Sequence, residues 1–240
     1  MQREKYDDIY IQELFNRMGP TYDVVNILSS LGFAEFWRRR CVLNAGVSPG
    51  ARVCDMMSGS GECWRYIVKR GASLVSVDFS TVMIQRQTKR LAHFGNAVEV
   101  RRENALQTSI EDSSIDHVVS AFGLKTLDQH GLVGFAREIR RISKPGGRFS
   151  LLEISTAEGW WPSKAYRFYI NSVIPLIGKI CLGDIECYRM LGVYTGEFRS
   201  CDRIAQTFVE TGLDVSVRHH FYGCATSLVG TKRADKPQRS

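Results

Sequence analysis

The chain has 240 residues, of which 44% are hydrophobic, and this length and composition favour one large globular domain over two small ones. No apolar run could cross a bilayer, and the start, MQREKYDDIY, lacks the basic and apolar regions of a signal peptide, so we expect a cytoplasmic protein without stable membrane insertion. The formal net charge of +7 comes partly from WRRR and REIRRISK, clusters typical of solvated helix faces; without a nucleic-acid motif, they predict no nucleic-acid partner.

Residues 1–46 show a helical pattern that is interrupted at Gly19 and Pro20. They lack the short alternating runs of strands, and they precede the first strand candidate. We therefore expect an N-terminal helical cover over the open end of a sheet.

Residues 47–156 alternate short apolar runs with helical patterns. The runs are ARVCDMM, SLVSVDF, IDHVVSAF and RFSLLEIS, with a weaker candidate in AVEVRREN. Before the last run, GLVGFAREIRRIS spaces its apolar residues by three and four, as an amphipathic helix does, and KPGG ends it. The alternation predicts an α/β fold: a Rossmann-like, doubly wound and mostly parallel sheet of seven strands, counting two from the C-terminal part.

The C-terminal part departs from this alternation. Residues 157–200 are rich in aromatic side chains and predict a helical lid. Within residues 201–233, CDRIAQTFVETGL predicts a helix capped at Cys201 or Asp202, and DVSVRHHF and CATSLVGTK predict an antiparallel hairpin that turns at YGC on the sheet edge. The polar tail, residues 234–240, is expected to be disordered.

The cysteines show no spacing typical of a zinc site, and we expect no metal. Their odd number and scattered positions favour free thiols in a reducing compartment. The seven are Cys41, Cys54, Cys63, Cys181, Cys187, Cys201 and Cys224.

The loop after the first strand run, CDMMSGSGECW, carries two glycines, Gly59 and Gly61. A dinucleotide site needs a third glycine where Trp64 stands, and the carboxylates of Asp55 and Glu62 would repel a pyrophosphate. The sulfonium and ammonium groups of S-adenosylmethionine would instead be attracted, and glycine lets the backbone approach its methionine part. The alternative is a tight turn between strand and helix without a ligand.

Further candidates end the later strand runs. Asp78 is placed to bind ribose hydroxyls, and Phe79 is either a wall for the adenine or a core aromatic. Asn104 could read an adenine edge or cap a helix. Ser120 and Phe122 would border the methyl group that is transferred.

These stretches together resemble the class I S-adenosylmethionine-dependent methyltransferases, and among them the ubiquinone/menaquinone C-methyltransferases of the UbiE/COQ5 group. The likeness runs over almost the whole chain. It includes YDVVNILSSLGFAEFW, VCDMMSGSGE, VDFSTVMI, ENALQTSIEDSSIDHVVSAFGLKTL, EIRRISKPGGRFSLLEIS and YRFYINSVIPLIGKI.

The resemblance implies S-adenosyl-L-methionine as the cofactor and assigns residues to it. It places a glycine-rich motif, a ribose-binding acid, an adenine-binding pair, an apolar residue near the adenine and a tyrosine that can close over the methionine end. In that order these are Asp55, Ser58, Gly59 and Gly61; Asp78; Asn104 and Ala105; Met83; and Tyr22.

Departures from the family fall mainly on the acceptor side. Ala34 and Glu35 stand where the quinone enzymes typically have His-Arg, and Lys125 and Thr126 stand where they have Arg-Asn. We therefore expect a small, largely apolar acceptor, aromatic or isoprenoid-like, in a specialised pathway, with methylation of carbon favoured and of oxygen or nitrogen left open.

For chemistry, Lys125 could supply a positive charge, and Tyr188, His219 or His220 could accept a proton from the acceptor. One of the two histidines should face the pocket, because they are neighbours in an alternating strand. The alternatives are a surface lysine and two structural histidines.

Other functions stay open at this point. They are a respiratory quinone methyltransferase, a methyltransferase fold repurposed for a reaction such as cyclisation, and a binding partner without catalysis, against which the complete cofactor motif argues. A homodimer and contact with a membrane surface are further candidates.

Overall fold

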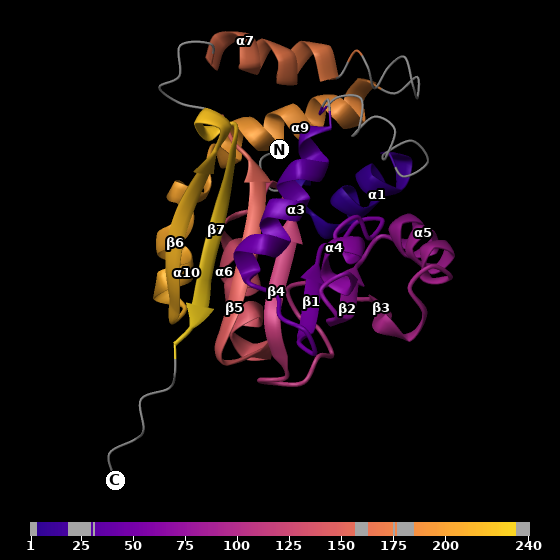
Figure 1. The fold of residues 1–240 in the computed structure, drawn as a ribbon. Helices are drawn as coiled ribbons and strands as arrows, with labels where there is room; N and C mark the ends of the chain where they lie inside the picture. The colour runs from indigo at the N-terminus through magenta and orange to yellow at the C-terminus, as the bar shows by residue number, and fades with distance from the viewer. Residues whose placement is uncertain are drawn as a thin grey trace.

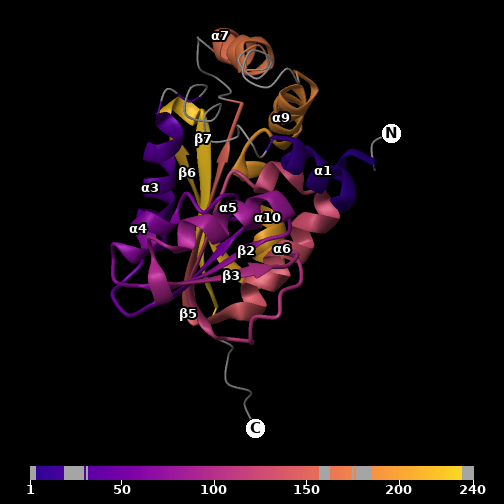
Figure 2. The same ribbon diagram turned by 90° about the vertical axis from the view of Figure 1, so that its right-hand side faces the viewer.

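A central sheet lies between two layers of helices (Figure 1). Seen from the side, α3 (Phe33–Ala45) covers one face of the sheet and α6 (Gln129–Ile142) covers the other (Figure 2). This computed structural model describes residues 4–18, 30, 32–156, 163–174, 176 and 185–233.

The sheet has seven strands in the order β3-β2-β1-β4-β5-β7-β6. The strands β3, β2, β1, β4 and β5 run parallel, whereas β7 is antiparallel to both β5 and β6. The predicted fold class, with its hairpin on the sheet edge, is therefore confirmed. The strands are β1 (Arg52–Met56), β2 (Ser73–Asp78), β3 (Val98–Arg102), β4 (Ile115–Ala121), β5 (Ser143–Ile154), β6 (Leu213–His220) and β7 (Ala225–Lys232).

The strand order reverses at β1, which pairs with β2 on one side and with β4 on the other. Chain connections leave β1 and β4 in opposite directions across the sheet, which opens a crevice at the carboxyl ends of these two strands. Ligands of open α/β sheets bind in this crevice.

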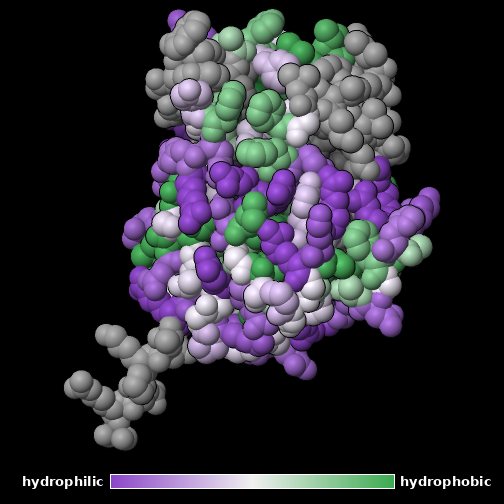
Figure 3. All heavy atoms as spheres, in the orientation of Figure 1, coloured by the Kyte–Doolittle hydropathy of each residue, from purple (hydrophilic) through white to green (hydrophobic). Residues whose placement is uncertain are grey.

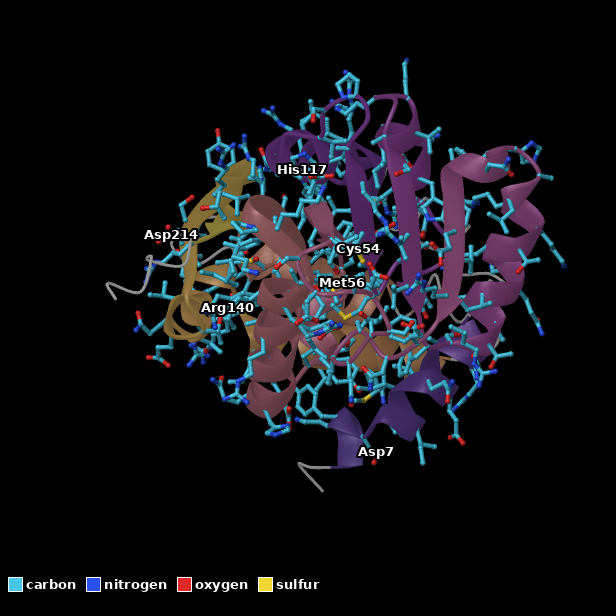
Figure 4. The ribbon with its side chains drawn as sticks, turned by 90° about the horizontal axis from the view of Figure 1, so that it is seen from below. Asp7, Cys54, Met56, His117, Arg140 and Asp214 are labelled. Atoms are coloured by element: carbon cyan, nitrogen blue, oxygen red, sulfur yellow. The ribbon has the colours of Figure 1, made fainter. Side chains whose placement is uncertain are left out.

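Two hydrophobic cores lie on opposite faces of the sheet because its central strands are buried on both sides. One core packs under α6 and α10 (Ala205–Glu210), and the other packs under α3 and α4 (Trp64–Val68). Cys54 and Met56 of β1 belong to the first core and lie near the centre of the molecule when it is seen from below (Figure 4).

Helix α6 shows how the sequence specifies these cores. Its residues at spacings of three and four, from Leu132 to Ile142, are buried, and the Asp128 carboxylate accepts a hydrogen bond from the Gly131 amide (2.7 Å) as the N-cap. The helix ends at Ile142 as predicted, but KPGG forms the first part of β5 rather than a separate loop.

The remaining helices lie beside the sheet or beyond its end. In both views α7 and α9 lie beyond the carboxyl ends of β1 and β4, where the sequence predicts a lid (Figures 1 and 2). The predicted boundaries between cover, core and lid stay predictions. The further helical segments are η1 (Glu4–Tyr6), α1 (Asp8–Met18), α5 (Thr81–Leu91), η3 (Gly95–Ala97), η4 (Leu124–Thr126), α7 (Ser163–Phe168), the π-helical η5 (Tyr169–Val173), α9 (Ile185–Phe198), η6 (Cys201–Arg203) and η7 (Phe221–Gly223).

The predicted single helix over CDRIAQTFVETGL is wrong, because the segment divides into η6 and α10. Neither Cys201 nor Asp202 caps it. The buried Cys201 amide instead donates to the Thr226 hydroxyl of β7 (2.9 Å), so a tertiary contact satisfies the group that a cap would have satisfied.

Five cysteines are buried free thiols, as the sequence predicts, and burial raises the pKa of the Cys41 thiol to about 12. Cys181 and the side chain of Cys187 lie outside the described residues. In the described part of the chain, no helix has the length and apolarity to cross a membrane. A cytoplasmic location and a homodimer stay predictions.

Exposed aromatic rings form a small cluster between α3 and the hairpin. The ring centroid of Phe33 lies 5.3 Å from that of Phe221, which lies 5.7 Å from that of Tyr222, and all three side chains are exposed. Apolar side chains gather on the upper part of the face in Figure 3, whereas its middle is mostly hydrophilic. Contact of this surface with a membrane stays a prediction.

Candidate functional site

A pocket of about 810 Å³, partly open to solvent, lies at the carboxyl ends of β1, β2 and β4. The strand-order reversal predicts a ligand site here. The predicted residues that line it are Ser58, Gly59, Asp78, Phe79, Met83, Asn104, Ala105 and Phe122. Asp55, Gly61 and Ser120 lie behind its wall, and Tyr22 lies outside the described residues.

The glycine loop after β1 needs its glycines. Gly59 and Gly61 have φ values of +58° and +86°, and a Cβ atom on Gly61 would lie 2.5 Å from the indole of Trp64. Trp64 is fully buried and stands where a dinucleotide site would have its third glycine. The loop therefore gives up the free helix start that a pyrophosphate needs.

Asp78 ties this loop to the next one along the sheet. Its carboxylate accepts hydrogen bonds from the amides of Gly59 (2.8 Å) and Ser80 (2.9 Å). Burial raises the pKa of Asp78 to about 7, although these two hydrogen bonds oppose the rise. The side chain lines the pocket and retains lone pairs that could accept from ribose hydroxyls.

Asp55 adds a second carboxyl group directly behind the pocket. Its side chain is 1% exposed, and Oδ2 has no hydrogen-bond partner within the described residues. Burial raises the pKa of Asp55 well above its usual range, and the carboxylates of Glu62 and Asp78 raise it further. Three carboxyl groups so close together favour a cationic ligand and disfavour a phosphate.

Arg38 of α3 brings a positive charge to the same place. Its guanidinium lies 3.3 Å from the Glu62 carboxylate and 5.2 Å from the centre of the Phe122 ring. The neighbouring Arg39 and Arg40 are exposed, whereas Arg38 is 5% exposed and lines the pocket. The expectation that WRRR forms only a solvated face is therefore wrong for Arg38.

At the adenine-binding position predicted from the sequence, Asn104 follows β3. Its side-chain oxygen accepts from the Leu106 amide (2.9 Å), and a turn rather than a helix follows, so the predicted alternative of a helix N-cap is wrong. Phe79, Met83 and Ala105 line the same side of the pocket.

Phe122 ends β4 in a left-handed conformation, with a φ of +70° that is rare outside glycine. Its ring lines the pocket, and Met57, which ends β1, also has a positive φ of +54°. Backbone strain of this kind collects at functional sites, because there it aims side chains at a ligand. Ser120 does not line the pocket, since its side chain is fully buried in the sheet packing near Cys41.

Lys125 is neither a surface lysine nor part of the pocket lining. Its ammonium donates to the Glu153 carboxylate (2.7 Å) and to the Phe122 carbonyl (2.8 Å), and both ends of the ion pair are buried. The predicted charge next to the acceptor is therefore taken up by an internal ion pair.

The prediction that one histidine faces the pocket is wrong. His219 pairs with Asp202 (3.2 Å), and His220 contacts the Ser227 hydroxyl (2.8 Å), on the outer strand β6 that β5 and β7 separate from β4. Burial and the nearby arginines lower the pKa of His220. The side chain of Tyr188 in α9 lies outside the described residues.

Several lining residues had no place among the predictions. Two come from α1, which is fixed over the pocket because Gln12 donates to the Phe79 carbonyl (2.7 Å) and Asn16 accepts from the Ser80 hydroxyl (2.8 Å). The residues missed are Ile11, Phe15, Arg38, Met57, Glu62, Leu106, Ala121, Gly123, Thr126 and Leu127. For Arg38 a signal existed, since it is spaced by four from both Ala34 and Val42 and so shares their buried helix face.

Comparison with known proteins agrees with this geometry. The chain matches the model of the ubiE/COQ5 methyltransferase family over residues 3–232. It is 28% identical over 231 residues to the demethylmenaquinone methyltransferase of Desulfitobacterium hafniense, covering 93% of this chain and 90% of that protein. It is 31% identical over 230 residues to the ubiquinone/menaquinone biosynthesis C-methyltransferase UbiE of Geotalea daltonii, covering 92% and 96%.

Solved structures share the fold. The crystal structure of a SAM-dependent methyltransferase from Aquifex aeolicus superposes with a TM-score of 0.60 at 15% identity, covering 88% of this chain and 97% of that one. At this identity the likeness concerns the fold alone.

Proposed function

Because this chain belongs to the ubiE/COQ5 methyltransferase family and is therefore an S-adenosylmethionine-dependent methyltransferase, we propose that it methylates a ring carbon of a hydroquinone-type acceptor. The predicted family, enzyme class and cofactor are confirmed by the family match. The acceptor and the atom methylated are the proposal.

The residues present fit the cofactor, whose sulfonium supplies an electrophilic methyl group for in-line displacement. Asp78 would accept from the ribose hydroxyls, and the backbone at Gly59 would lie against the methionine part. Asn104 and Met83 would border the adenine. The buried Asp55 oxygen without a donor, next to Glu62 and Asp78, supports a cationic ligand at this end of the pocket.

One observation carries the acceptor proposal: the pocket continues from these carboxylates into an apolar region. Met57, Phe122 and Leu127 line it together with Ile11 and Phe15 of α1. An apolar wall around an aromatic ring orients it by shape and excludes water, and holding the reacting carbon in line with the sulfur supplies much of the catalysis.

The departures from the quinone enzymes bear little on this pocket. Glu35 pairs with Arg65 and Tyr66 at the protein surface, and neither it nor the buried Ala34 lines the pocket. Only Thr126 lines it, and its hydroxyl donates to the Gly123 carbonyl (2.7 Å). An acceptor like the quinols of the named relatives is thus favoured over the predicted acceptor of a specialised pathway, which stays a prediction.

The test is transfer of an isotope-labelled methyl group from S-adenosylmethionine to a panel of acceptors. The panel holds demethylated naphthohydroquinones and benzohydroquinones with short isoprenoid chains, the same rings without a chain, and simple catechols. Label in the ring of a hydroquinone would support the proposal. Label only on oxygen, or consumption of an acceptor without label as in a cyclisation, would contradict it.

A further inference from the structure

The pocket wall at the glycine loop carries two opposite charges side by side. Arg38 reaches it from α3 and Glu62 from the loop after β1, and their nearest charged atoms are 3.3 Å apart. Both side chains are largely buried, with exposed fractions of 6% and 14%. Within the described lining of the pocket, Arg38 is the only cation, whereas Glu62 and Asp78 are both carboxylates.

The methionine end of the cofactor also carries two opposite charges side by side, since its ammonium and its carboxylate are bonded to the same carbon. A wall of carboxylates alone would attract the ammonium and repel the carboxylate. We propose that Arg38 binds the carboxylate of S-adenosylmethionine while Glu62 binds its ammonium, so that this pair makes the site selective for the complete amino-acid end.

The surroundings of Arg38 hold its guanidinium in place for this role. Its helix neighbours Trp37 and Cys41 are buried in the core between α3 and the sheet, which fixes the start of the side chain. The Phe122 ring, whose backbone is held at a φ of +70°, lies 5.2 Å from the guanidinium carbon. A planar guanidinium fixed in this way can bind a carboxylate through two parallel hydrogen bonds, which lysine cannot do.

The contact between Arg38 and Glu62 leaves room for such an exchange of partners. At 3.3 Å it is longer than a strong charge-assisted hydrogen bond, which is about 2.7–2.9 Å. Asp55 lies close enough to Glu62 and Arg38 for both charges to act on its pKa, so the site keeps an excess of carboxylate when Arg38 is occupied. That excess suits the sulfonium.

The test measures equilibrium binding of two ligands by calorimetry, in the absence of any acceptor. One is S-adenosylmethionine and the other is decarboxylated S-adenosylmethionine, which lacks only the carboxylate. The unaltered protein should bind the first at least tenfold more tightly. Arg38→Met should remove most of this preference by weakening the first ligand about tenfold or more while changing the second less than about threefold.

Two further variants sharpen the result. Arg39→Met, which removes the exposed neighbour on the same helix, should leave both affinities unchanged. Arg38→Lys keeps the charge and the fold but loses the paired hydrogen bonds, so it should retain part of the preference.

Equal weakening of both ligands by Arg38→Met, or no preference in the unaltered protein, would overturn the assignment. The inference rests on the cofactor of the proposed function but not on its acceptor. If the unaltered protein bound neither ligand, the proposed function would fail too, whereas tight binding without selectivity would overturn the Arg38 assignment alone.

Discussion

At the scale of single residues, Asp78 has the most to do, because one carboxylate holds the glycine loop, the start of α5 and the expected ribose. Burial raises its pKa to about 7, whereas the unfolded chain ionises near 3.8. Between these values the native state holds more protons than the unfolded state. The contribution of Asp78 to the free energy of unfolding therefore falls as the pH rises through this window and is constant above it.

Cofactor affinity should depend on pH in the opposite direction. Ribose hydroxyls and a sulfonium both favour the ionised carboxylate, so binding should release a proton from Asp78 and tighten about tenfold between about pH 6 and about pH 8. Calorimetry in buffers with different ionisation enthalpies measures both the affinity and the proton release.

Asp78→Asn is the matched control for this pH dependence. It should bind S-adenosylmethionine more than tenfold more weakly at about pH 8, because it loses charge-assisted hydrogen bonds of about 1.5–3 kcal/mol each. Its affinity should be nearly independent of pH. A pH dependence as steep as in the unaltered protein would assign the titration to Asp55 or Glu62 instead.

His220 gives a prediction of little change. Its imidazole bonds to Ser227 within the edge hairpin and does not line the pocket, so His220→Ala should keep kcat within about twofold. It should lower the free energy of unfolding by about 1 kcal/mol through the lost hydrogen bond. A loss of kcat beyond about a hundredfold, with unchanged cofactor affinity, would restore the histidine as a proton acceptor.

At the scale of elements, the ends of β4 and β5 are joined by the buried pair Lys125 and Glu153. The Glu153 carboxylate also accepts from the backbone amides of Lys125 (3.1 Å) and Ile154 (2.8 Å), and the Lys125 ammonium holds the carbonyl of the strained Phe122. The pair thus shapes the apolar wall of the pocket from behind.

Lys125→Met should lower the free energy of unfolding by about 3–5 kcal/mol, because it leaves the fully buried Glu153 carboxylate without its cation. Chemical denaturation measures the loss. The double variant Lys125→Met with Glu153→Gln should recover much of it, since no uncompensated charge then remains. A single variant as stable as the unaltered protein would show that the ion pair contributes nothing.

Helix α1 closes the pocket from the side of β2 and α5. It places Ile11 and Phe15 in the lining, and Gln12 and Asn16 anchor it to the loop that starts with Phe79. A cofactor seated against Phe79 can then leave only when α1 moves.

Gln12→Ala should speed release of S-adenosylhomocysteine about fivefold, because one hydrogen bond of about 1 kcal/mol holds the helix in place. Stopped-flow displacement measures the rate, and Glu13→Ala, at an exposed position one residue on, is the control. Equal release rates for the two variants would show that α1 does not gate the pocket.

At the scale of the whole molecule, the sequence was most informative where the pattern is local. Short apolar runs and an amphipathic helix predict the layers, and the glycine loop with Asp78 predicts the ligand edge, because parallel strands bring their carboxyl ends together. The packing of one element against another is not local. The position of α1 over the pocket depends on contacts such as Gln12 with Phe79, which no pattern announces.

The same limit explains the histidines and Lys125. Alternation says that neighbouring residues of a strand face opposite sides, but the strand order decides whether either side adjoins the pocket, and β6 is the outer edge. Lys125 was read from its charge, yet Glu153 comes from another strand and takes that charge up. Arg38 is the reverse case, since its helical spacing already indicated burial within a basic cluster.

The central claim is that this methyltransferase places its methyl group on a ring carbon of a hydroquinone. The most direct measurement is nuclear magnetic resonance of the product made with isotope-labelled S-adenosylmethionine and a demethylated hydroquinone. The account predicts a labelled methyl resonance typical of an arene carbon, with both phenolic hydroxyls retained. A resonance typical of a methyl ether, or no labelled product while the protein binds the cofactor, would contradict it.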